Sequence, residues 1–176
     1  MLQRLNSISA ALFGDTRLFS LEHRLFNTIS LLNAAANIGG AFAVLSMENG
    51  AFLFFLNFGT GLLFLLFYYL SRFRKAFEYL YWPFVLLIVC FLFINALENA
   101  GSQGGAHYYF IPALVIAIIL SNKIRRTAIA IALFCGAALV LLILEQVHPD
   151  WITAHANKQE RFIDIAGNLL FVKVFM

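Results

Sequence analysis

The chain has 176 residues, of which 62% are hydrophobic and only 12% charged, with a formal net charge of +3. A soluble domain is about 45–50% apolar and about 25% charged, so a water-soluble globule of this size could not bury so much apolar surface. The basic residues lie between apolar runs and do not pool in one polar segment, which excludes a nucleic-acid-binding protein and is typical of membrane proteins.

The N-terminal segment, residues 1–24, precedes the first long apolar run. It lacks the continuous apolar core of a cleavable signal peptide. The apolar residues of its first 14 positions fall roughly on one side of a helix, so the cytoplasmic segment is predicted to be amphipathic, with a helix at 1–14 lying on the membrane: Leu2, Leu5, Ile8, Leu12 and Phe13. A disordered start is the alternative.

Six apolar segments follow, and a membrane-spanning helix needs about 20 such residues. The predicted spans are residues 25–47, 51–70, 79–97, 107–120, 127–144 and 161–176. The connections between them are a polar turn at 47–50, a basic break at 71–75, a Gly-rich loop at 98–105, a basic break at 121–126 and a polar connection at 145–160. The predicted fold class is therefore all-α, a polytopic membrane protein whose six-transmembrane-helix bundle occupies residues 25–176.

Lysine and arginine predict the orientation, because basic residues are retained on the cytoplasmic side. Placing the N-terminus inside makes most of them cytoplasmic: Arg4, Arg17, Arg24, Arg72, Arg74, Lys75, Lys123, Arg125 and Arg126. Only Lys158 and Arg161 are then outside, and Lys173 lies near the inner end of the last helix. Both termini are therefore predicted to be cytoplasmic.

The sixth segment is short for a spanning helix. It has only about 15 residues after Arg161 and ends without a polar flank. We expect the last helix to be truncated and a cytoplasmic part to follow residue 176; a short, tilted last helix is the alternative.

Asparagines within the apolar segments are candidate ligand contacts, because polar residues in lipid are costly and usually face the bundle interior. Asn33 and Asn37 are one turn apart in the first helix, and Asn57 and Asn95 lie in the second and third. They are interpreted either as interhelical hydrogen bonds, each worth about 0.6 kcal/mol, or as the lining of a ligand pocket.

The two polar outer loops supply the other candidate ligand contacts, which are Glu98, Ser102, Gln103, His107, Tyr108 and Trp151. Membrane-boundary anchoring is the alternative for the two aromatic residues among them. His148, Asp150 and His155 are metal-ligand candidates, but their spacing matches no established pattern, so no metal site is predicted.

No catalytic residue or cofactor is predicted in the chain. No histidine lies in the middle of an apolar segment, as a membrane haem would require, and no catalytic motif occurs. Cys90 and Cys135 fall in apolar runs and are interpreted as buried small hydrophobes.

Four stretches resemble one class of bacterial multi-pass sensor modules. Residues 20–27 (SLEHRLFN) resemble the start of the first helix of these modules, and residues 68–74 (YYLSRFR) resemble their first cytoplasmic loop. Residues 99–105 (NAGSQGG), followed by the aromatic run 108–110, are similar to their outer Gly-rich loop, with Ala100 where Gly is usual and Gly105 where Pro is usual. Residues 145–164 resemble their last outer loop and the start of their last helix.

The resemblance covers nearly the whole chain from Phe19 onward. It implies an N-terminal module of a membrane histidine kinase, or less often of a nucleotide cyclase or phosphatase, with an architecture similar to six-helix receptors for quorum-sensing ketones. It further implies signal reception and anchoring in the bacterial inner (plasma) membrane, a homodimer, an unidentified small ligand and an effector domain following residue 176. A small transporter and a structural subunit of a membrane complex are the alternatives.

Overall fold

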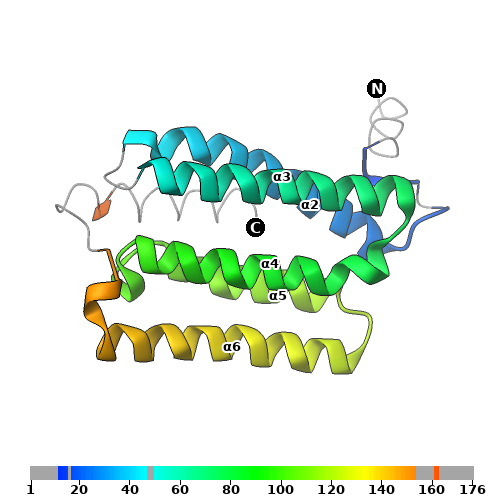
Figure 1. Ribbon diagram of the computed structural model, residues 1–176. Helices are drawn as coiled ribbons and strands as arrows, with labels where there is room; N and C mark the ends of the chain where they lie inside the picture. Colours follow the sequence, from blue (N-terminus) through cyan, green and yellow to red (C-terminus); the bar gives the residue numbers. More distant parts are fainter. Residues whose placement is uncertain (1–11, 16, 47–49, 154–160, 163–176) are drawn as a thin grey trace. The chain divides into compact units, whose positions relative to one another are not determined.

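The computed structural model describes residues 12–15, 17–46, 50–153 and 161–162. Every regular element in these ranges is helical (Figure 1). The long elements are α2 (Leu21–Ala43), α3 (Gly50–Arg74), α4 (Phe77–Glu98), α5 (Phe110–Leu120) and α6 (Ile124–Val147). Short 3₁₀ helices follow or separate them: η1 (Val44–Ser46), η2 (Gly101–Gln103), η3 (Ala106–Tyr109) and η4 (Pro149–Trp151). The predicted all-α class is confirmed.

Three of the described helices, α3, α4 and α6, are long and apolar enough to cross a membrane. Helix α2 is 23 residues long but is not among them, and its sequence carries three asparagines. The apolar helix formed by η3 and α5, Ala106–Leu120, is shorter. The sixth predicted span lies outside the described residues except for Arg161 and Phe162, so the six-span arrangement stays a prediction.

Several helix boundaries differ from their sequence-based positions. Helix α2 begins at Leu21 and not at residue 25, because the Ser20 side chain caps it by accepting the N–H of His23 at 3.3 Å. Helix α3 continues through the basic residues to Arg74, where a break was predicted from residue 71. Helix α6 likewise begins at Ile124. Arginine is a good helix former, so positive charge alone does not end a helix.

The chain folds into two compact units, here described separately. The first comprises residues 1–84 and 120–122, and the second residues 85–119 and 123–176. In the first unit α2 and α3 lie side by side (Figure 1). The buried positions of α2 recur every three or four residues and so form one face: Phe26, Asn27, Ser30, Ala34, Asn37 and Ala41.

Gly61 allows the close approach of α2 and α3. A Cβ atom there would lie 2.6 Å from Ile38 Cγ1 and 3.2 Å from the carbonyl oxygen of Ala34. A glycine and an alanine at facing positions let two helix backbones approach closely, which is how membrane helices commonly pack.

Phenylalanines complete the core of the first unit. Phe26 and Phe84 are fully buried and Phe64 is nearly so. The ring of Phe84 lies 4.7 Å from that of Phe26 and 5.5 Å from that of Phe64, measured between centroids. These tilted and edge-on arrangements are favoured by the aromatic quadrupole, so the first turns of α4 are fixed against both α2 and α3.

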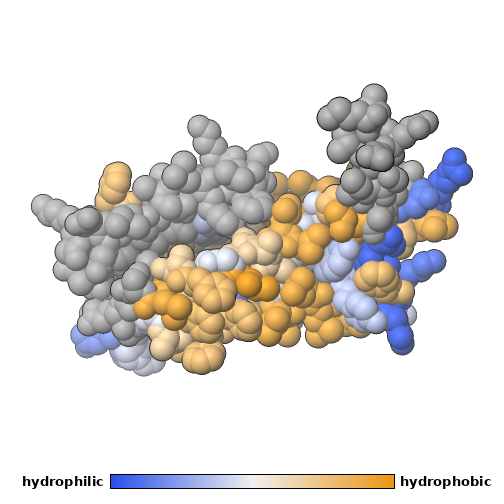
Figure 2. Space-filling view, turned by 90° about the horizontal axis from the view of Figure 1, so that it is seen from above, coloured by the Kyte–Doolittle hydropathy of each residue, from blue (hydrophilic) through white to orange (hydrophobic). Residues whose placement is uncertain are grey.

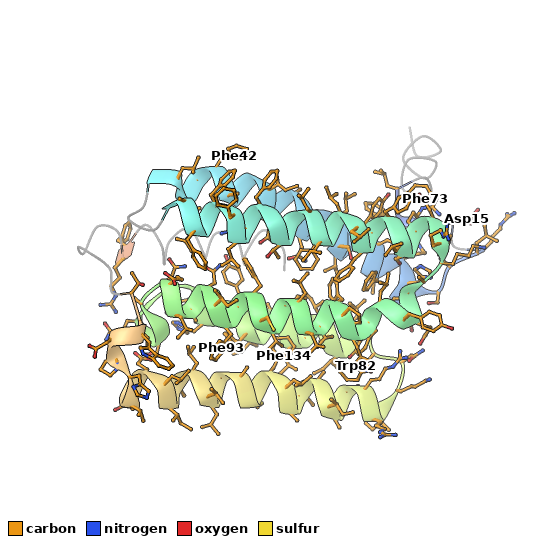
Figure 3. The ribbon with its side chains drawn as sticks, in the orientation of Figure 1. Asp15, Phe42, Phe73, Trp82, Phe93 and Phe134 are labelled. Carbon is orange, nitrogen blue, oxygen red and sulfur yellow. The ribbon has the colours of Figure 1, made fainter. Side chains whose placement is uncertain are left out.

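The core of the second unit joins α4, η3 and α6 through Ala96, Ala106 and Leu141, with Phe93 packed against them (Figure 3).

Cys90 and Cys135 are exposed, so their interpretation as buried side chains was wrong. Hydrophobic residues cover much of the helix sides on the face shown in Figure 2. Helix α6 is the least buried of the three long apolar helices, because only 17% of its most apolar stretch is covered by other parts of the chain. Most of its apolar surface is therefore free to contact an apolar environment such as lipid.

Candidate functional site

A polar cluster in the second unit contains several of the predicted ligand contacts. It begins where α4 ends, because Ala100 and Gly101 both adopt left-handed backbone conformations, with φ of 56° and 57°. The chain therefore turns sharply into η2. The N–H of Ala100 donates to the Thr153 carbonyl at 2.9 Å, and the N–H of Thr153 donates to the Leu97 carbonyl at 2.9 Å. The segment that follows α6 is thus paired with the end of α4.

Glu145, near the end of α6, holds η2 in place. Its Oε1 accepts the Ser102 hydroxyl at 2.9 Å, and its Oε2 accepts the Ser102 backbone N–H at 3.2 Å. A Cβ at position 101 would lie 3.2 Å from Glu145 Oε2, so glycine leaves room for the carboxylate. The Thr153 hydroxyl donates to Glu98 Oε2 at 3.3 Å. We call Glu98, Ala100, Ser102, Glu145 and Thr153 the loop cluster.

The loop cluster brings together two loops that are far apart in the sequence, the Gly-rich loop after α4 and the polar connection at the end of α6. Glu98 and Ser102 were predicted contacts, but Glu145 and Thr153 were not recognised as their partners. The local signal for Glu145 was its position at the start of a polar connection, and no local pattern indicates a partner 43 residues away.

Replacing Ala100 with glycine is expected to raise the free energy of unfolding by about 0.5–1 kcal/mol. The left-handed conformation costs a residue with a Cβ roughly 1 kcal/mol, and glycine adopts it freely at some cost in chain entropy. Thermal unfolding in neutral detergent measures the effect, with Ala106→Gly as control because Ala106 is buried and has no positive φ. An Ala100→Gly protein that is no more stable than the wild type would contradict the expectation.

Of the remaining outer-loop candidates, His107, Tyr108 and Trp151 belong to aromatic ring pairs, and Gln103 does not. The ring centroids of His107 and Tyr108 lie 3.9 Å apart, and both residues belong to η3, the start of the apolar helix Ala106–Leu120. His107 Nδ1 is buried with no hydrogen-bond partner among the described residues. Trp151 stacks on His148 at 4.6 Å and is 61% exposed. Gln103 is also exposed.

The predicted asparagine contacts bond to residues four positions away along the chain, within α2 and α3 or at the end of α4. Asn33 and Asn37 donate to carbonyls one turn earlier, of Ile29 and Asn33, each at 2.9 Å. Asn57 donates to Leu53 at 2.8 Å. Asn95 accepts the Asn99 side-chain amide at 2.8 Å. These bonds use some of the hydrogen-bonding groups of the asparagine side chains without a ligand. A ligand pocket lined by the asparagines stays a prediction.

A second polar cluster, outside the predicted ligand contacts, lies in the first unit. The Ser71 hydroxyl donates to Asn27 Oδ1 at 2.6 Å, and Asn27 Nδ2 donates to the Phe13 carbonyl at 2.9 Å. Asn27 and Ser71 are both fully buried. Nε2 of His23 lies 3.0 Å from the Ser71 carbonyl oxygen, so His23 satisfies a carbonyl in the last turn of α3. This cluster ties the start of α2 to the end of α3.

His23 lies before the predicted first span, and its surroundings favour the neutral ring. Burial lowers its pKa most, and the positive charges of Arg72 and Lys75 lower it further. The hydrogen bond to the Ser71 carbonyl and the Glu78 carboxylate act in the opposite direction, and the balance is a pKa below 6.5. The ring also stacks on Phe77, with centroids 5.2 Å apart.

Acid is therefore expected to destabilise the chain through His23. A histidine whose pKa is lowered on folding binds fewer protons folded than unfolded, so its contribution is present above about pH 6.5 and is lost as pH falls below that value. The unfolding midpoint between pH 8 and pH 5 measures this. The acid-side decrease should be smaller in His23→Asn than in the wild type, and equal decreases would contradict the expectation.

The structure brings no three His, Cys, Asp or Glu side chains together as a metal site within the residues it describes. His148 precedes η4 and Asp150 lies within it. His155 lies outside the described residues.

Comparison with known proteins gives no relative: no family model, no curated protein and no solved structure matches the chain. The fold itself therefore defines the class, an all-helical protein with three described helices long and apolar enough to cross a membrane.

Proposed function

We propose that this protein is a membrane-embedded sensory and anchoring module that passes a signal to a cytoplasmic effector, a histidine kinase. The observation that carries the proposal is the loop cluster. Its bonds from Glu145 and Thr153 join the turn after α4 to the end of α6 and to the segment beyond it. A change at the turn therefore reaches α6 and the following chain directly.

The proposed mechanism uses the Ser102–Glu145 contact as the element that a ligand alters. A ligand with its own donors competes for the Glu145 carboxylate and releases η2 from α6. A hydrogen bond to a charged group contributes about 1.5–3 kcal/mol, enough to change a two-state equilibrium by 10-fold or more. The ligand needs only to prefer the released packing for the populations to change.

The proposed topology places the loop cluster outside the inner membrane and the Arg72–Lys75 turn in the cytoplasm. It has six spans, both termini inside and a homodimeric assembly, as the basic residues and the resemblance to sensor modules indicate. The effector domain is proposed to follow Met176.

The test uses the complete native gene product in inverted membrane vesicles supplied with ATP. We expect phosphate bound to histidine, which is labile in acid and stable in base, and we expect Glu145→Gln and Ser102→Ala to change its amount by 10-fold or more. Asp150→Asn is the matched control, because Asp150 is exposed and is not part of the loop cluster. The proposal fails if the protein carries no phosphohistidine, or if the cluster variants signal as the control does.

A further inference from the structure

Three positive charges lie in the last turn of α3 and at the residue that follows it. We call Arg72, Phe73, Arg74 and Lys75 the basic turn. Arg74 and Lys75 are exposed, and neither side chain forms an ion pair with a carboxylate in the ranges that the structure describes. Lys75 has a left-handed backbone with φ of 55°, a conformation that favours glycine. The backbone conformation would favour glycine at position 75, so it does not account for the presence of lysine there.

The Phe19 ring contacts two of these cations. The guanidinium carbon of Arg72 lies 5.1 Å from the centroid of the Phe19 ring, and Nζ of Lys75 lies 6.0 Å from the same centroid. Both distances are within or close to the range of cation–π attraction. One buried ring thus positions two positive charges at the end of α3, which concentrates positive potential at the turn.

Large apolar side chains are exposed within α3 beside these charges and in the segment on either side of Phe19. Phe73, which is labelled in Figure 3, is 62% exposed. Tyr69, one turn earlier, is 53% exposed, and its ring centroid lies 5.3 Å from that of Phe73. Leu18 and Leu21 are 68% and 64% exposed. A soluble anion would neutralise the cations and leave these side chains in water. A membrane interface satisfies both groups, because aromatic rings lie at headgroup level and basic residues contact lipid phosphate.

We propose that the basic turn binds the phosphate of an anionic phospholipid headgroup, with Arg74 and Lys75 contacting the phosphate and Phe73 and Tyr69 entering the adjoining apolar layer. Nearby carboxylates are otherwise engaged. Asp15 accepts the backbone N–H of Arg17 at 2.9 Å, and Glu78 accepts the Asn122 side chain at 3.0 Å. The inference rests on the membrane location in the proposed function and adds a lipid partner at a defined turn.

The experiment measures lipid binding by the full chain in neutral detergent, using native mass spectrometry with dioleoyl-phosphatidylglycerol and dioleoyl-phosphatidylcholine. The wild type is expected to bind the anionic lipid at least 10-fold more tightly. Because the two cations that contact the lipid phosphate are removed, the double variant Arg74→Gln, Lys75→Gln is expected to lose about 10-fold or more in affinity for the anionic lipid. Glutamine has a Cβ as lysine does, so the energetic cost of the left-handed backbone at position 75 is the same in the variant and the wild type.

The matched control is Lys123→Gln, Arg125→Gln, which removes the same charge at two exposed residues of the other basic break. Its affinity for the anionic lipid should stay within twofold of the wild type. Equal losses in the two double variants, or equal affinity of the wild type for both lipids, would overturn the proposal. Displacement of the lipid by inorganic phosphate would indicate a soluble-anion site and would also overturn it.

A second measurement needs no variant. Amine acetylation of the wild type is expected to be slowed at Lys75 by phosphatidylglycerol, with little change at Lys123, and to be unaffected by phosphatidylcholine; equal slowing at both lysines contradicts the site. Reconstitution into bilayer nanodiscs separates the two proposals. A chain that does not enter the bilayer contradicts the proposed function, whereas a chain that enters and does not discriminate between the lipids contradicts only the lipid site.

Discussion

Replacing Gly61 with leucine is expected to destabilise the packing of α2 against α3 by about 3 kcal/mol, the upper end of the usual cost of overpacking. The first atom of any side chain at this position would lie 2.6 Å from Ile38 Cγ1 and 3.2 Å from a backbone oxygen. The Ile38 side chain can rotate away, but the Ala34 carbonyl moves only with the α2 backbone. The helices must therefore separate, and the buried face of α2 loses contact with α3.

The control for this variant is Gly59→Leu in the same helix. A Cβ at Gly59 has no atom within 4 Å among those described, so leucine there gains helix propensity without a clash. Unfolding by a denaturing detergent, followed by circular dichroism, compares the two proteins. The account of α2–α3 packing is contradicted if both variants are equally stable.

Removing either partner of the buried Asn27–Ser71 bond is expected to cost about 1–3 kcal/mol, because the remaining polar group stays buried without its partner. Asn27→Ala has the larger expected effect, since it also removes the donor to the Phe13 carbonyl. The double variant should be less destabilised than the sum of the two single variants. The expected coupling energy is about 1 kcal/mol, within the range measured for contacting residues.

Thr28→Ala is the control for this cycle. The Thr28 hydroxyl donates to the Arg24 carbonyl within the same helix at 2.9 Å, so its loss is expected to cost less than about 0.5 kcal/mol. Equilibrium unfolding of the three variants and the wild type gives the coupling energy. Strict additivity of Asn27→Ala and Ser71→Ala would show that the two side chains do not interact.

The helical class was predictable because it depends on local composition and run length. The long apolar runs of α3, α4 and α6 indicate their helices directly. The ends were harder to predict, because Arg72 and Arg74 favour helix, whereas their charge had been taken as the end of a predicted span. His107 and Tyr108 were assigned to a span because the apolar residues after them extend the run, and they form the 3₁₀ start of the apolar helix Ala106–Leu120.

The candidate site was predictable only in part, because its contacts join distant positions. Ser102 and Glu98 stand out as polar residues in a Gly-rich loop, whereas Glu145 acquires its role only when α6 brings it to η2. The Asn27–Ser71 bond spans 44 residues and has no local pattern. Asn33 and Asn57 illustrate the opposite case, since each satisfies its amide within its own helix.

The most direct test of the proposed membrane sensor asks on which side of the membrane the Gly-rich loop and the basic turn each lie. Gln103→Cys and Arg74→Cys, each in a Cys90→Ala, Cys135→Ala background, place single thiols at exposed positions. A membrane-impermeant maleimide added to intact bacterial spheroplasts is predicted to label position 103 and to label position 74 only after the inner membrane is permeabilised. Labelling of both positions before permeabilisation, or of position 74 alone, would contradict the proposed topology.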